Sequence, residues 1–209
     1  KGDLNQLVKE VVTISKLPPS GYPDCFFEVE LNKVIRVGKD LLLNEFEIAK
    51  FVGQVCPVPF DPRFKYADII EKELNKYGVG ECYRVILGAD KNQIYRPFQD
   101  KFQLKTELFD VFTEVEFLTI SSEPKAIGWV LGHSYLGAIP KSSGISGLRL
   151  RIGNTQVGGD DILADIFPES RFNFWTVAEF HILDSQIVPN GRRDNFEQNL
   201  VFSEVVDHL

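Results

Sequence analysis

The sequence predicts an α+β fold, a mixed sheet with flanking helices. Segments that alternate apolar and polar residues, as strands do, dominate the second half of the chain. Helical spacing of apolar residues occurs near the start, in the middle and at the end. The chain has 209 residues, 44% hydrophobic and 25% charged, so it can bury a sizeable core. Strands in the majority with fewer helices indicate α+β rather than a repeating βα pattern.

The first forty residues hold one predicted helix and one predicted strand. Leu4, Leu7 and Val11 recur at helical spacing, which indicates an amphipathic helix from Asp3 to about Ser15. Prolines, serine and glycine then predict a loop. Alternation within residues 27–37 predicts a strand or hairpin. We therefore assign 1–25 to an N-terminal helix and linker.

Two helices are expected in the middle of the chain. Asn44 is a candidate N-cap of the first, which we expect to end before Pro57. Its buried side is predicted from the apolar positions Phe46, Ile48, Phe51, Val52 and Val55. The second helix is predicted over 67–77, with Gly78 ending it.

The remaining segments are predicted to be mainly strands. Strands are expected at 83–87, 94–95, 111–120, 126–131, 148–152 and 175–183, a short helix at 161–167, and a closing helix at 194–209. The region 26–209 is treated as one unit, with a weak subdivision near 88–105. The sequence begins at Lys1 in mid-pattern, so we expect a segment of a longer protein; it also contains no methionine.

Composition narrows the function classes. The net charge of −7 and a pI near 5.1 argue against a nucleic-acid-binding surface. No apolar run is long enough to span a membrane, and no secretory signal opens the chain, so we expect a cytoplasmic protein. Three widely spaced cysteines and three histidines offer no metal-ligand spacing, so no metal site is predicted.

The stretch LDSQIVPNGRRDNFEQN, residues 183–199, attracts most attention. A turn is predicted from Pro189, Asn190 and Gly191. Arg192 and Arg193 follow this turn, at the expected N-terminus of a helix. One interpretation is a capped turn whose arginines pair with Asp184, Asp194 or Glu197. The other is an arginine held rigidly outward toward an anionic group, most plausibly a phosphate.

Other nucleotide and enzyme motifs are missing from the sequence. There is no GxxxxGK[ST], no GxGxxG that opens a helix, and no GxSxG. The small-residue loop at 142–147 fits an anion cradle or, preferably, a flexible connection. Arg149 and Arg151 share one strand face and are expected to pair with nearby acids. Trp129 and Trp175 are expected to be core or interface anchors.

Three segments carry a resemblance to a known family: GWVLGHSYLGAIP, GLRLRIGNTQVGG and ESRFNFWTVAEFHILDSQIVPNGRRDNFEQN. They resemble the gyrase B, heat-shock chaperone, histidine kinase and MutL (GHKL) ATPase superfamily, most closely its heat-shock-protein-ninety-like branch. In that branch a strand leads to an acidic turn, a proline, an asparagine and an Arg-Glu pair. Asp184, Pro189, Asn190 and Arg193 match this pattern, whereas Asp194 replaces the usual glutamate.

The resemblance implies a middle, or transducer, domain of β-α-β type that follows an ATP-binding domain. It implies that Arg193 contacts the γ-phosphate of ATP, that Asn190 holds the loop, and that Arg192 is a neighbour in the same site. ATP and Mg²⁺ would bind to the parent protein only, through its N-terminal ATP-binding domain. The isolated chain is then expected neither to bind nor to hydrolyse ATP.

Two further functions remain open at this stage. The chain is expected to serve as a protein-interaction module for clients or partners if it exposes a sizeable apolar patch. Nucleic-acid processing, as in gyrase or MutL relatives, is disfavoured by the acidic balance. Homodimerisation of the parent is compatible with the resemblance.

Overall fold

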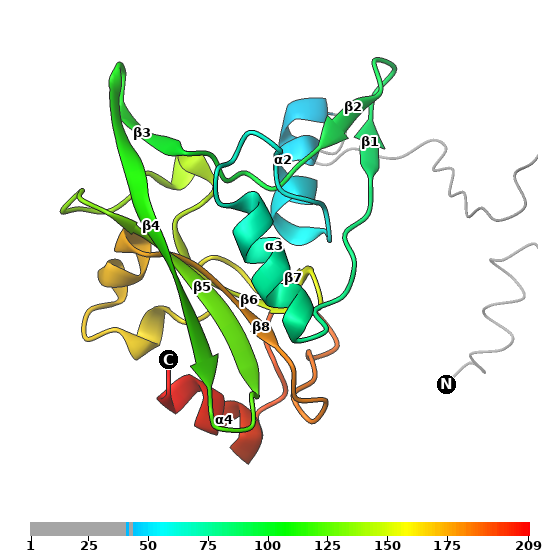
Figure 1. Cartoon of the computed structure of the whole chain (residues 1–209), viewed down its shortest axis with the longest axis vertical. Coiled ribbons are helices and arrows are strands. Elements are labelled where there is room, and N and C mark those ends of the chain that lie inside the picture. Colours follow the sequence, from blue (N-terminus) through cyan, green and yellow to red (C-terminus); the bar gives the residue numbers. More distant parts are fainter. Residues whose placement is uncertain (1–40, 42–43) are drawn as a thin grey trace, which may run out of the picture. The chain divides into compact units, whose positions relative to one another are not determined.

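A computed structural model describes Leu41 and residues 44–209 (Figure 1). The predicted helix at 3–15, the strand within 27–37 and the assignment of 1–25 lie outside the described residues.

The fold is organised around a six-stranded mixed sheet with the order β3-β4-β5-β8-β6-β7, so the predicted α+β class is confirmed. Strands β6 and β8 are parallel, and the other neighbours are antiparallel. Its strands are β3 (Lys101–Lys105), β4 (Leu108–Ile120), β5 (Ala126–His133), β6 (Gly147–Ile152), β7 (Thr155–Val157) and β8 (Val177–Ile182). A separate hairpin pairs β1 (Val85–Leu87) with β2 (Asn92–Ile94).

In the part of the chain that the structure describes, three α-helices accompany the sheet: α2 (Glu45–Val55), α3 (Ala67–Lys76) and α4 (Leu200–Asp207). The predicted N-cap of α2 is confirmed, because Asn44 Oδ1 accepts hydrogen bonds from the N–H groups of Phe46 and Glu47. The predicted end of α3 is confirmed as well, with Gly78 at φ +69° just beyond it.

The two faces of the sheet bury separate cores. On one face, α3 and the proline-rich segment before it pack against β5, with Trp129 at the centre of an aromatic cluster that includes Phe60 and Phe98. On the other face, α4 packs through Phe202 and Val205 against β6 and β8. Trp129 is fully buried, so the expectation of a core anchor is confirmed for this residue.

The predicted buried side of α2 is wrong at two positions, because Phe46 is 73% exposed and Phe51 is 63% exposed. The buried position of this helix is Gly53, where an added Cβ would lie 2.7 Å from the carbonyl oxygen of Tyr95. Helix α2 therefore packs closely against the backbone of Tyr95 at a glycine, and the spacing of its apolar residues does not predict this contact.

The predicted helix at 194–209 begins six residues later, at Leu200. Its cap is Asn199, whose Oδ1 accepts from Phe202 N at 2.8 Å. The residues before Asn199 are not helical, because Phe196 forms an antiparallel bridge with Pro189. Asp194 therefore does not lie in a helical first turn, and Leu200, the first residue of α4, is 83% exposed.

Three further elements differ from the prediction. Strand β7 was not predicted, and neither was β3, although Phe102 and Leu104 alternate with polar residues. The predicted helix at 161–167 is reduced to a short 3-10 turn, Ala164–Ile166. The stretch 88–105 holds β2, β3 and Arg96, whose side chain reaches β8.

Candidate functional site

The segment between β8 and α4 forms a tight turn that presents Arg192 and Arg193. The backbone N–H of Arg193 donates to the carbonyl of Asn190 at 3.0 Å, and the N–H of Asn190 donates to the carbonyl of Asn195 at 2.9 Å. Arg193 itself has φ +59°, a left-handed conformation that is uncommon outside glycine. The turn is therefore closed by hydrogen bonds on both sides of the arginine pair.

Side chains fix the same turn. Asn190 Nδ2 donates to the carboxylate of Asp194 at 2.7 Å. Asp184 is occupied locally, because its carboxylate accepts from the N–H of Gln186. Arg192 and Arg193 are both exposed, and within the described part of the chain neither forms an ion pair. The pairing of these arginines with neighbouring acids, one of the two interpretations above, is not seen among these residues.

A glycine at the end of β7 anchors the turn to the sheet. The N–H of Gly158 donates to the carbonyl of Arg193 at 3.0 Å. Gly158 has φ +72°, and an added Cβ would lie 2.9 Å from the carbonyl oxygen of Asp194 and 2.5 Å from Ile162 Cδ1. Only glycine accommodates both this conformation and this approach, so the position of the arginine turn depends on Gly158.

Beneath the sheet surface lies a second polar cluster, fully buried. Two guanidiniums share the carboxylate of Glu179 on β8. Arg96 Nη1 lies 2.7 Å from Glu179 Oε2, and Arg151 Nε lies 2.7 Å from Glu179 Oε1. Arg151 also donates to the carbonyls of Asn154 and Gln54. The cluster thus joins β6, β8 and α2 to the segment after β2, and the expectation that Arg151 pairs with an acid is confirmed.

The charges in this cluster are strongly perturbed. Burial opposes ionisation of Glu179, but the two arginines outweigh it and lower its pKa from 4.5 to about 2. Burial lowers the pKa of His181, the next inward residue of β8, from 6.5 to about 3. His181 Nδ1 lies 2.6 Å from the carbonyl of Gly153, which assigns the ring proton to Nδ1 and leaves Nε2 without a hydrogen-bond partner in the described region.

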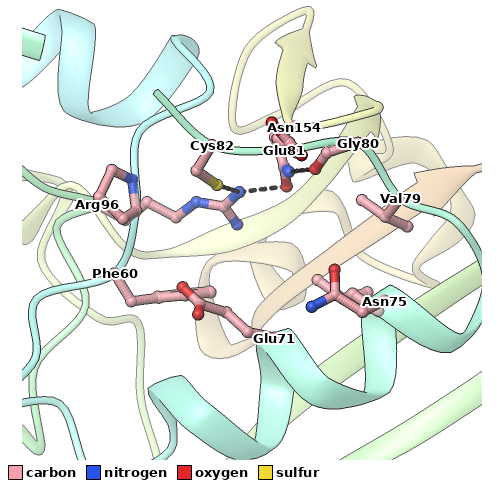
Figure 2. Close-up of a pocket in the computed structure, with 11 residues that line it drawn as sticks. Phe60, Glu71, Asn75, Val79, Gly80, Glu81, Cys82, Arg96 and Asn154 are labelled. Atoms are coloured by element: carbon pink, nitrogen blue, oxygen red, sulfur yellow. Dashed lines mark hydrogen bonds between the residues drawn. The ribbon is translucent and has the colours of Figure 1, made fainter. Parts of the chain in front are cut away.

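A cavity of about 320 Å³ opens above this cluster between α3 and the segment at 79–82 (Figure 2). Arg96 forms its inner wall, stacked on the ring of Phe60 at 4.5 Å from the ring centre. Arg96 Nη2 donates to Asn154 Oδ1 and lies 3.8 Å from Cys82 Sγ. Burial raises the pKa of the Cys82 thiol, so this cysteine is a poor nucleophile.

The small-residue loop at 142–147 does not point its N–H groups at an anion site. Arg149 donates to the carbonyls of Gly144 and Ile145, at 3.0 and 2.6 Å. Gln54 Nε2 also donates to the carbonyl of Gly144. The loop therefore serves as an acceptor for a buried arginine, and Arg149 contacts backbone rather than the acids expected as its partners.

Sequence reasoning missed Glu179 and Arg96. Glu179 and His181 stand two residues apart on β8, so they share one face of the strand, and both are fully buried. Two charged or titratable residues in one apolar strand were the available signal.

Within the described residues, no helix is long and apolar enough to cross a membrane, and no group of three or more metal-binding side chains occurs. Comparisons of the chain with protein-family models, curated proteins and solved structures found no match.

Proposed function

We propose that this chain is a transducer domain that couples ATP binding and hydrolysis in a neighbouring GHKL-type domain to conformational change. The observation that carries the proposal is the exposed arginine pair on a turn closed by hydrogen bonds. In this proposal Arg193 contacts the γ-phosphate, Asn190 holds the turn through Asp194, and Arg192 adds positive charge beside it.

The electrostatic argument concerns the transferred phosphoryl group. Its negative charge is spread over three oxygens in the transition state, and a guanidinium can donate to two of them at once. A side chain on a fixed turn loses little further freedom when it docks. Arg193 meets this condition, because its N–H and its carbonyl are both hydrogen-bonded and its side chain is exposed.

The route for mechanical coupling starts at the same turn. The turn follows β8, which lies between β5 and β6 in the sheet, and it is bonded to Gly158 at the end of β7. Strand β8 also carries Glu179, which holds Arg96 and Arg151. Binding of Arg193 to a nucleotide would therefore move the sheet and its ion cluster together as one rigid body. Hydrolysis would release Arg193 from the phosphate and allow the sheet to move back.

The test is ATP turnover by the full-length protein that contains this chain, with Arg193→Ala compared to Arg171→Ala. Arg171 is an exposed arginine that pairs with Glu169 on the surface, so it is a matched control. We expect turnover to fall roughly a thousandfold for Arg193→Ala, with near-normal ATP affinity, and to be unchanged for the control. Tight ATP binding by the isolated chain in calorimetry would contradict the proposal that the neighbouring domain alone binds ATP.

A second function is favoured by a separate observation. Leu41, Phe46 and Phe51 are 54%, 73% and 63% exposed. Leu41, Ile48 and Phe51 line an apolar depression of about 410 Å³ beside α2. Exposed aromatic residues in a group are typical of interaction surfaces. If Phe46→Ser with Phe51→Ser abolishes client or partner binding and leaves ATP turnover intact, the interaction function is supported independently.

A further inference from the structure

The sheet has an open edge at β3 with a groove beside it. Within the described residues, β3 is the outermost strand on this side of the sheet and pairs only with β4. Figure 1 shows the β3–β4 hairpin extending away from the helices. The groove of about 490 Å³ runs along the whole strand, from Pro97 to Thr106, and its far wall is the segment 140–145.

Among the residues that the structure describes, no strand pairs with the outer side of β3. The N–H of Phe112 donates to the carbonyl of Asp100 at 3.0 Å, so these two residues form a hydrogen-bonded pair. Antiparallel pairs alternate along a ladder, and Lys101 lies opposite Val111 while Gln103 lies opposite Phe109. The N–H and C=O groups of Lys101 and Gln103 therefore point away from β4, toward the groove.

The groove has both apolar surface and positive charge. Leu104, Phe109 and Ile145 provide apolar lining, and two lysines, Lys101 and Lys105, line it without any carboxylate. Lys101 is held in place, since its ammonium lies 4.8 Å from the ring centre of Phe109. Lysines on an edge strand normally discourage strand addition, but the same charges select a strand that carries acids.

We propose that the β3 edge binds an extended segment of a partner protein that alternates acidic and apolar residues. The segment would add a seventh strand beside β3, with its backbone hydrogen-bonded to Lys101 and Gln103 and its carboxylates beside the lysines. A second copy of this chain is a poor occupant, because β3 paired with itself would place lysines against lysines. This proposal does not depend on the transducer function.

The test uses a fluorescent peptide of alternating glutamate and valine, titrated with the chain and followed by anisotropy. Lys101→Glu is expected to weaken binding about tenfold, because attraction to the acidic strand becomes repulsion at two neighbouring positions. Lys72→Glu, the same charge change at an exposed position of α3, is the matched control and is expected to leave affinity unchanged.

A backbone test separates strand addition from simple charge attraction. Gln103→Pro removes an outward N–H, which an edge strand tolerates, and a peptide N-methylated at alternate residues removes the partner's donors without altering the protein. Both changes are expected to abolish binding. The proposal is overturned if the peptide does not bind at millimolar concentration, if Lys101→Glu binds as tightly as wild type, or if the methylated peptide binds equally well. It is also overturned if the free chain is a dimer that Gln103→Pro dissociates.

Discussion

Replacing Glu179 with glutamine removes the carboxylate that two buried guanidiniums share, without changing the shape of the side chain. Arg96 and Arg151 are 1% exposed at the side chain, and Glu179 is 0% exposed. The amide of glutamine offers one acceptor and one donor, so its NH₂ group would face an arginine N–H. Arg96→Met would instead remove one of the two positive charges and leave the remaining ion pair intact.

Two independent considerations give the magnitude for Glu179→Gln. The pKa of Glu179 is lowered from 4.5 to about 2, which corresponds to roughly 3 kcal/mol of stability at neutral pH. Removing one partner of a buried ion pair costs about 3–5 kcal/mol. For a domain of this size each kcal/mol moves the melting temperature by roughly 2–4 °C, so we expect a drop on the order of 10 °C.

The assay is thermal and urea denaturation of the chain, followed by circular dichroism. Glu204→Gln is the matched control, because Glu204 pairs with Lys125 at the surface and is 57% exposed. The control is expected to cost less than about 1 kcal/mol. If Glu179→Gln also costs less than about 1 kcal/mol, the cluster is not a strongly coupled ion network.

Further predictions concern pH and the arginine turn. Burial lowers the pKa of His181 from 6.5 to about 3, so the stability that its neutral form contributes is present above pH 6.5 and is lost as pH falls toward 3. His181→Gln is expected to flatten the decline in unfolding free energy between about pH 6.5 and 4.5, measured by urea titrations at each pH; an unchanged slope would contradict this. Gly158→Ala should cost more stability than Gly153→Ala and should also slow ATP turnover. Both glycines have positive φ, but only at Gly158 would the new methyl group meet other atoms; equal effects of the two alanines would show that the contact is unimportant. Asn199→Ala removes the cap of α4 and is expected to cost about 1 kcal/mol, measured by urea denaturation, and no loss would refute its role.

The fold class and most strands followed from alternation and turn residues, because each sheet face buries one set of alternating side chains. The start of α4 did not, since Phe196 stands four residues before Leu200, which is an acceptable helical spacing. The backbone of residues 194–199 instead bonds across the turn to residues 188–190. The spacing of apolar residues does not show whether the backbone of this segment forms hydrogen bonds along a helix or across a turn, because the tertiary structure decides between them.

The polar cluster shows a different limit. Arg151 and Glu179 were each visible as charged residues in apolar strands, but Arg96 is 83 residues from Glu179 in sequence. Their contact depends on how the segment after β2 packs against β8, and no local pattern encodes it. At the arginine turn, by contrast, the residues that form the turn were all within one stretch, and the turn itself was predicted from Pro189, Asn190 and Gly191.

In the proposed function, the guanidinium of Arg193 acts on the γ-phosphate during hydrolysis. The most direct measurement is the single-turnover rate of ATP hydrolysis by full-length Arg193→Ala, with and without added guanidinium ion, beside Arg171→Ala. We predict a rate reduced roughly a thousandfold that free guanidinium partly restores, while the control hydrolyses ATP at the wild-type rate. A wild-type rate for Arg193→Ala would contradict the account and leave the turn with a structural role.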